Sequence, residues 1–510
     1  MNEISAAEQV GFPILSTLVF LPVLTMVALA FVRSDRALRR VALAGALVVL
    51  FLSLVLTALF RRDVSDFQFG EQLPWVEAIG VSYHLAVDGV SVLFVPLTAL
   101  LVVVVMLTSW TSVRHQPKAY LIAVLAFETA AIGVFTSVDL ILFFVFWELM
   151  LIPTYVVIKI WGTGSQRGRA ALRYVLAMLL GSSALLVGFV LLGVDYRSSE
   201  GSDGALSFDL LELMSSPAGP GTQTTVFFLL GFAFALKAPM FPFHGWLAGT
   251  LVEGPIGMAM FLAGLKMGVF GFLRFVLPLA PDAFAQWSWL VALLGVVAVL
   301  YGALIALVQQ DLRRLVAFAS ISHVGLAMLG LSTLNAQGLQ GALFLIDNLA
   351  LVSTGMLLAA GYIHLRFGST DLSALGGLAG RMPLLTTFTL VVSLGAIALP
   401  GTSGFPGEFL VLLGAFRAHG WLAMVAVVTV ILAAAYVLVS LERAFHGRVR
   451  GTVAAAVQDL RPREAVPAAI IGVLIITVGF FPGAVLDYSS ASVDDLVHRL
   501  DSSTTASTEN

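Results

Sequence analysis

A small set of ionisable side chains lies inside stretches that are otherwise apolar and long enough to cross a membrane. The set consists of Glu128, Glu148, Lys237, Lys266, His323 and Glu408. An ionisable side chain at the centre of a span costs at least ~2.5–3.5 kcal/mol on insertion scales, so each position needs a physical reason. The chain has only four lysines among its 27 Lys and Arg residues, and two of them belong to this set. Because a buried lysine can release its proton whereas arginine cannot, this usage indicates proton transfer inside a membrane.

Each member of the set also has a purely structural interpretation. Glu148 could fix the packing of a neighbouring helix, and Lys237 could serve only as its ion-pair partner. Lys237 lies beside a proline-containing segment, however, where water could reach it. Lys266 lies too deep to reach the interface easily. His323 could be a satisfied core histidine, although histidine titrates in the range that proton transfer needs.

Other ionisable residues lie at or near the ends of the apolar stretches. Asp139 and Asp311 each begin a stretch, so we expect them to cap helix N-termini. His244 is a weaker candidate for proton transfer because it lies near an expected interface. Asp347 is less certain still, and Glu253 is expected to be a loop charge.

The composition is that of a membrane protein with many spans. Hydrophobic residues make up 59% of the chain and charged residues 11%, compared with roughly 25% charged residues in soluble domains. The absence of cysteine excludes disulfides, thiolate-bound iron–sulfur clusters and cysteine catalysis. We find no phosphate-binding glycine loop, dinucleotide fingerprint or clustered metal ligands, and the eight scattered histidines do not suggest a haem site.

The hydrophobic pattern predicts an all-α polytopic fold with about 14 transmembrane helices. A span needs about 20 mostly apolar residues, and the candidate spans are too long and too uniformly apolar to be strands. The predicted spans are 12–32, 41–60, 85–110, 119–137, 139–160, 170–193, 223–246, 254–279, 286–308, 313–331, 338–365, 384–417, 421–445 and 465–486.

Charge in the loops predicts the orientation. Lys and Arg gather after spans 1, 3, 5 and 13, for example at 33–40 and 443–463. Acidic residues follow span 6, at Asp195, Glu200, Asp203, Asp209 and Glu212, and also mark the C-terminal tail. Since cytoplasmic loops carry an excess of Lys and Arg, the odd loops are expected in the cytoplasm and both termini outside.

Two spans are interrupted, and their spacing suggests an internal repeat. Span 7 contains Pro239 and Pro242 after Lys237, and span 12 contains Pro400 and Pro406 before Glu408. Paired broken helices five spans apart run in opposite directions and are typical of inverted-repeat transporters. We therefore expect N-terminal helices over 1–118, two inverted five-helix repeats over 119–279 and 286–445, and a last helix with a polar tail over 446–510.

Several segments taken together resemble the antiporter-like subunits of respiratory complex I, the proton-translocating NADH–quinone oxidoreductase. They are residues 85–91 (LAVDGVS), 146–155 (FWELMLIPTY), 237–247 (KAPMFPFHGWL), 311–323 (DLRRLVAFASISH) and 404–409 (GFPGEF). The resemblance extends from span 3 to span 12. Glutamate at position 408 is typical of the subunit M branch of the family, whereas related branches usually have lysine there.

The resemblance implies a role for each residue of the set. Glu148 and Lys237 match a gating ion pair, Lys266 and His323 a central relay, and Glu408 an outlet group, with Glu128 and His244 as further candidates. It also implies a multi-pass protein of the cell (inner) membrane that has related antiporter-like subunits on both sides. No redox centre, cofactor or metal is expected on this subunit and no nucleic acid as partner, because quinone reduction elsewhere in the complex would drive it.

The chain departs from the family pattern at two places. Residues 248–251 read Ala-Gly-Thr-Leu where the family usually has Pro-Asp-Ala-His, and the histidine usual around 348–349 is absent. Asp347 or water could replace that histidine, or the relay could differ. A subunit of a multi-subunit cation/proton antiporter is the first alternative function, and a membrane scaffold whose charges only hold helices together is the second.

Overall fold

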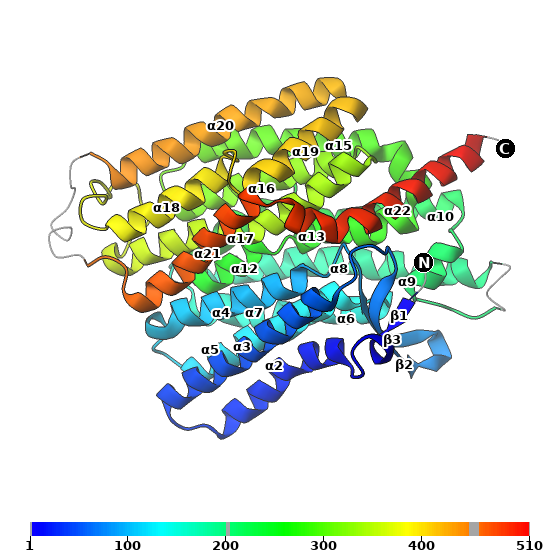
Figure 1. Cartoon of the computed structure of the whole chain (residues 1–510), viewed down its shortest axis with the longest axis horizontal. Coiled ribbons are helices and arrows are strands. Elements are labelled where there is room, and N and C mark those ends of the chain that lie inside the picture. The colour runs from blue at the N-terminus through cyan, green and yellow to red at the C-terminus, as the bar shows by residue number, and fades with distance from the viewer. Residues whose placement is uncertain (1–2, 200–203, 448–457, 509–510) are drawn as a thin grey trace.

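Long helices run side by side through most of the molecule in the computed structural model (Figure 1). The structure describes residues 3–199, 204–447 and 458–508. Glu200 and Asp203, which contributed to the predicted charge asymmetry, lie outside the described residues, as do Arg448 and Arg450. The two described ends of the chain, in the first strand and the last helix, lie at the same end of the bundle (Figure 1).

The N-terminal part combines helices with a small sheet. Its elements are β1 (Glu3–Ser5), α1 (Ala6–Gln9), α2 (Ile14–Phe31), α3 (Asp35–Leu59), β2 (Phe67–Val76), a 3-10 turn (Glu77–Ile79), β3 (Val81–Val87) and α4 (Phe94–Ser112). β2 pairs in parallel with β1 and antiparallel with β3. The sheet corrects the expectation that span 3 begins at residue 85, because residues 81–87 form a strand and the helix begins only at Phe94.

The middle part contains several short helices between long ones. Its elements are α5 (Pro117–Thr136), α6 (Leu140–Leu149), α7 (Leu151–Trp161), α8 (Arg167–Arg197), α9 (Leu210–Ser215), α10 (Pro220–Lys237), α11 (Gly245–Glu253), α12 (Ile256–Gly264), α13 (Met267–Gly271), a π-helical turn (Phe272–Val276) and α14 (Leu277–Leu279).

The named elements of the C-terminal part are all helices among its described residues. Its elements are α15 (Pro281–Leu307), α16 (Leu312–Leu331), α17 (Ala336–Phe367), α18 (Pro383–Ala396), α19 (Gly404–Ala418), α20 (Gly420–Phe445), α21 (Pro462–Phe480) and α22 (Gly483–Thr508). The last element, α22, lies in the expected polar tail and is a helix that packs against α15 and α17.

Twelve helices among the described residues are long and apolar enough to cross a membrane, which makes the chain a multi-pass membrane protein. Each corresponds to one predicted span. The two predicted spans without a counterpart are 223–246 and 384–417. These are the spans in which interruptions were predicted, and both are divided, into α10 and α11 and into α18 and α19. The count of 14 stays a prediction.

A third break divides span 8, for which the sequence predicted a continuous helix. α12 ends at Gly264, Lys266 has a non-helical backbone (φ −89°, ψ 54°), and α13 begins at Met267. Between Pro255, which precedes α12, and Pro278 the segment contains no proline, so the usual sequence signal for a break is absent near Lys266. This break is a correction to the predicted span 254–279.

The expected helix caps are confirmed. The Asp139 carboxylate accepts hydrogen bonds from the backbone N–H groups of Ile141 and Leu142 (both 2.9 Å). Asp311 caps α16 in the same way, through Arg313 and Arg314. Both confirm the structural interpretation of these aspartates.

The chain segments at these two caps also pair in the same way with a distant segment. Leu140 N–H donates to Phe208 O (2.8 Å) and Leu210 N–H to Val138 O (3.1 Å). In the second half, Leu312 N–H donates to the carbonyl oxygen at 370 (3.0 Å) and the N–H of 372 donates to that of 310 (2.7 Å). The cap segments correspond at a separation of 172 residues and their partner segments at 162, which supports the predicted repeats; these remain a prediction.

A buried histidine joins the sheet to the helix bundle. His84 on β3 is 1% exposed. Its Nδ1 contacts the carboxylate of Asp209, which caps α9, and its Nε2 lies 2.9 Å from Glu3 Oε2 on β1. Burial by itself disfavours the charged imidazolium, but the hydrogen bonds and negative charges of the two carboxylates outweigh it and raise the pKa of His84 to about 9.

We predict that the attachment of β1 weakens as the pH rises through about 9. The folded-state pKa of His84 lies above the ordinary 6.5, so its stabilisation, at most about 3 kcal/mol, is fully present below pH 6.5 and lost through pH 9. Proteolytic cleavage of the N-terminal segment, measured between pH 6 and 10, should increase over this range. His84→Gln is the control and should show no such step. Identical pH profiles for both proteins would contradict the prediction.

Candidate functional site

Glu148 and Lys237 each lie next to the end of a helix. Glu148 is the next-to-last residue of α6, and Lys237 is the last residue of α10, directly before the first break. The Glu148 carboxylate acts electrostatically on the Lys237 ammonium, but within the described chain the two groups form no ion pair shorter than 4.0 Å. The predicted pair is therefore a neighbouring acid and base rather than a closed salt bridge.

Aromatic rings occupy the space next to the Lys237 ammonium. Its Nζ lies 4.7 Å from the centre of the Trp147 ring and 5.9 Å from that of Tyr174. A ring face attracts a cation without taking its proton. The rings thus hold the lysine head group beside Glu148 and leave its protons free to move.

The first break has its own hydrogen bond. Trp246 Nε1–H on α11 donates to Leu236 O on α10 (2.9 Å), which satisfies one carbonyl that the interrupted helix would leave unpaired. His244 lies in this break, with its ring 4.9 Å from that of Tyr301, and its Nδ1 has no hydrogen-bond partner among the described residues. His244 therefore has a free ring nitrogen between Lys237 and the second half of the molecule.

Lys266 lies at the third break, between α12 and α13, and is 1% exposed. Its Nζ donates to Ser320 Oγ on α16 (2.6 Å). A close approach of backbones brings this break next to the first one. A Cβ added to Gly268 would lie 2.3 Å from Ala238 N and 2.4 Å from Phe234 O, so only glycine permits this approach.

His323 and Glu408 contact each other between α16 and α19. His323 Nε2 on α16 lies 3.3 Å from Glu408 Oε1 on α19, and Nδ1 lies 2.7 Å from Ala319 O. Since a backbone carbonyl only accepts, Nδ1 carries a proton in this geometry. Both side chains are buried.

Four side chains thus form a nearly continuous row. Lys266 donates to Ser320, and Ser320 precedes His323 by three residues, which places the two on the same face of α16 about 4.5 Å apart along its axis. His323 then contacts Glu408. A hydroxyl both donates and accepts, so it can pass a proton between a lysine and a histidine. The row has the groups that a proton relay needs.

Among the described residues, no hydrogen bond or ion pair connects two of the candidate carboxylates with the row. Neither oxygen of Glu128, which is fully buried on α5, has a hydrogen-bond partner among the described residues. Asp347 on α17 is also buried, and the described residues provide no partner for its Oδ1. The neighbouring Asn348 instead accepts a hydrogen bond from Ser403 Oγ (2.5 Å), at the break before α19. Where the family usually has histidine, this chain therefore has an amide that binds the interrupted segment between α18 and α19.

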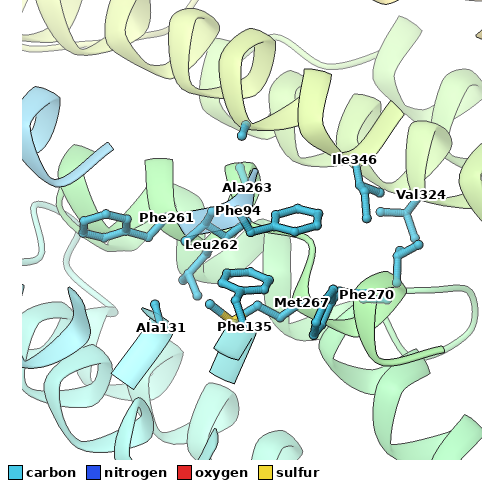
Figure 2. Close-up of a cluster of buried hydrophobic side chains, with 14 of the residues drawn as sticks. Phe94, Ala131, Phe135, Phe261, Leu262, Ala263, Met267, Phe270, Val324 and Ile346 are labelled. Atoms are coloured by element: carbon cyan, nitrogen blue, oxygen red, sulfur yellow. The ribbon is translucent and has the colours of Figure 1, made fainter. Parts of the chain in front are cut away.

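Apolar side chains pack tightly beside the row. In Figure 2, Met267, Val324 and Ile346 lie in one buried cluster with Phe94, Phe135 and Phe270, and each of the first three is the sequence neighbour of Lys266, His323 or Asp347. The rings of Phe94 and Phe135 stack with centroids 4.6 Å apart, and Phe270 lies edge-on to Phe135 at 5.0 Å. Close packing of this kind leaves no room for water among these apolar side chains.

Sequence reasoning missed Ser320 and Gly268. Ser320 lies one turn before His323, and this i, i+3 spacing was a signal that could have identified it. Gly268 had no comparable signal, because its role depends on the approach of a helix that is distant in the sequence.

The chain matches known proteins over almost its entire length. Residues 137–433 match the family model described as NADH:quinone oxidoreductase/Mrp antiporter, TM. NADH-quinone oxidoreductase subunit M of Rhodobacter capsulatus is 36% identical over 501 residues (95% of this chain, 96% of that protein), and subunit M of Rickettsia prowazekii is 34% identical over 494 residues (95% and 99%).

Solved structures share the fold. A chain of respiratory complex I from Thermus thermophilus matches with a TM-score of 0.85 and 33% identity, over 95% of this chain and 99% of that one. A chain of the Mrp complex from Dietzia sp. matches with a TM-score of 0.81 and 22% identity (95% and 98%), a likeness of fold alone. By its sequence and its fold, the chain belongs to the NADH:quinone oxidoreductase/Mrp antiporter family.

Proposed function

We propose that the chain is a proton-translocating membrane-arm subunit of an NADH–quinone oxidoreductase, equivalent to subunit M. The buried row from Lys266 through Ser320 and His323 to Glu408 is the observation that carries the proposal. The similarity to proteins named subunit M over 95% of the chain supports it. The chain contributes proton translocation to the activity of the complex, and quinone is reduced elsewhere.

The proposed mechanism starts at Glu148 and Lys237. When Glu148 is charged, it stabilises the Lys237 ammonium, and withdrawal of that negative charge favours release of the lysine proton. The proton then passes to Lys266, whose break packs against the first break at Gly268. His244, with its free Nδ1, is a candidate for the intervening step.

The second half of the path uses the row, in which Lys266 contacts Ser320, His323 contacts Glu408, and Ser320 and His323 lie three residues apart on α16. Lys266 transfers a proton through the Ser320 hydroxyl to His323, and Glu408 receives it as the outlet group. Glu408 lies in the second turn of α19, close to a break, and we assign the exit of the proton to that break, because irregular backbone inside a membrane can line a water-filled cavity. Glu128 is assigned a lower-ranking role, since no described residue connects it to the row.

The proposed location is the cell (inner) membrane, with both termini on the outer side and related antiporter-like subunits as neighbours. The common end at which β1 and α22 lie supports termini on one side (Figure 1). Contact with lipid or another subunit is supported by exposed apolar side chains on α6, α7 and α8, including Leu149, Ile152, Leu172 and Leu179.

The orientation can be tested by labelling, because the chain has no cysteine. Ser165→Cys, between α7 and α8, should react with an impermeant thiol reagent from the cytoplasmic side. Ser215→Cys, at the end of α9, should react from the outside. Both serines are exposed, so neither change should affect folding. Labelling of both from the same side would overturn the orientation.

The Lys237→Arg variant tests proton release. We expect normal assembly and a several-fold lower proton translocation, because arginine keeps the positive charge beside Trp147 but cannot release its proton. Lys159→Arg is the matched control, since Lys159 is exposed at the end of α7. Proton uptake per electron should be measured in membranes with equal complex content. Full translocation by Lys237→Arg would show that deprotonation at this site is unnecessary.

The Glu408→Gln variant tests the outlet. Glutamine retains the size and a hydrogen bond to His323 but cannot titrate, so translocation should fall several-fold while the complex assembles. Glu408→Asp should be partly active because its carboxylate is one methylene shorter. Glu212→Gln, at an exposed site on α9, is the control. A scaffold role predicts that Glu408→Gln is tolerated or prevents assembly, and wild-type translocation by this variant would refute the outlet assignment.

A further inference from the structure

Five arginines surround a cavity of about 730 Å³ at one end of the bundle, far in sequence from the relay. They are Arg36, Arg39, Arg40, Arg114 and Arg463, from α3, the segment after α4, and α21. Among the described residues none of the five forms an ion pair within 4.0 Å, and Asp35 is the one carboxylate in the cavity lining. The cavity therefore carries a large uncompensated positive charge.

The dipoles of two helices add to the positive potential at the cavity. Arg36, Arg39 and Arg40 lie in the first turns of α3, and Arg463 lies in the first turn of α21. The N-terminus of a helix carries a partial positive charge, so basic residues there are unfavourable and an anion is favoured. Two such N-termini meet at one cavity. An anion bound between them would offset both effects.

Two of the arginines are held in place by other contacts. Arg39 Nη2–H donates to Val113 O after α4 (3.0 Å), and the Arg463 guanidinium lies 5.7 Å from the centre of the Trp110 ring. These contacts connect α3, α4 and α21 around the cavity without neutralising any charge. The guanidinium fork matches the oxygen atoms of a phosphate.

The face of α3 that continues from the arginines is apolar and exposed, as expected of a surface that contacts lipid acyl chains. Arg36, Arg40, Leu43, Leu47, Phe51 and Leu54 follow one another at intervals of three or four residues and therefore share one helix face. Leu47, Phe51 and Leu54 are 46%, 63% and 53% exposed. From Arg40 to Phe51 the helix rises about 16 Å, close to the hydrocarbon thickness of one leaflet, about 15 Å.

We propose that this cavity binds the head group of an anionic phospholipid, with the acyl chains along the exposed face of α3. A phosphodiester without a compensating ammonium matches the five unpaired arginines, and basic pockets between helices on the cytoplasmic side are suited to such lipids. The bound lipid joins α3, α4 and α21, which are the second, the third and the last of the apolar helices that are long enough to cross a membrane among the described residues. The site is independent of the proposed proton relay.

The test uses the purified, detergent-washed complex that contains this chain, with photoactivatable phosphatidylglycerol as the probe. Crosslinks should map to residues 35–54 and 107–114. Unlabelled phosphatidylglycerol should compete at least tenfold more effectively than phosphatidylcholine, and inorganic phosphate should not compete at the same concentration. Equal competition by phosphatidylcholine would overturn the proposal, and so would effective competition by phosphate, which would indicate a site for free anions. These measurements need no variant.

A pair of variants provides the second arm. Arg40→Gln combined with Arg463→Gln should weaken phosphatidylglycerol crosslinking roughly tenfold or more. Arg169→Gln combined with Arg173→Gln removes two exposed arginines from the N-terminal end of α8 and is the matched control, which should crosslink as the wild type does. If an acidic segment of a neighbouring subunit occupies the cavity instead, crosslinking will map to that subunit and neither pair will change it, which overturns the proposal.

Discussion

The interior of this protein depends on how polar groups are satisfied in an apolar medium. A helix that crosses a membrane can be interrupted only where other groups take the place of its lost hydrogen bonds. All three interruptions in the central region lie next to an ionisable residue of the proposed relay. Lys237 ends α10, Lys266 precedes α13, and Glu408 follows the break before α19. The breaks create the polar positions, and the charged side chains occupy them.

The helix ends also favour the charges that they carry. Lys237 lies at the C-terminal end of α10, where the helix dipole stabilises a cation. Glu408 lies in the first turns of α19, where the dipole stabilises an anion. Elsewhere, the buried charge of Arg274 in the π-helical turn is matched by Asp88, with Nη1 donating to Oδ2 at 2.9 Å. That pair anchors the loop before α4 to span 8, close to the Lys266 break. Removing either partner would leave a buried charge unpaired, which is more costly than the intact pair.

The sequence was sufficient to predict the helices, two of the three breaks and the buried ionisable residues, because these depend on composition and local chemistry. Pro239 and Pro400 indicated their breaks directly. The break at Lys266 could not be predicted in this way, since no proline marks it and the neighbouring approach of Gly268 to Ala238 joins it to a helix that is distant in the sequence. The strand over residues 81–87 was also missed, because its apolar residues continue into those of α4 and only pairing with β2 separates the two. The roles of Glu128 and Asp347 stay predictions.

The arrangement of the row limits how a proton could move. Lys266, Ser320, His323 and Glu408 come from three different spans, and each contact connects one helix with another. The row therefore crosses between helices rather than following one helix from end to end. A proton that enters at one break and leaves at another must travel sideways through the bundle before it leaves. Under the proposed function and the predicted inverted repeats, this lateral path would have its two openings on opposite sides of the membrane. Access at each end and transfer along the row are then separate steps, and a charge change at Glu148 can control the first without altering the geometry of the second.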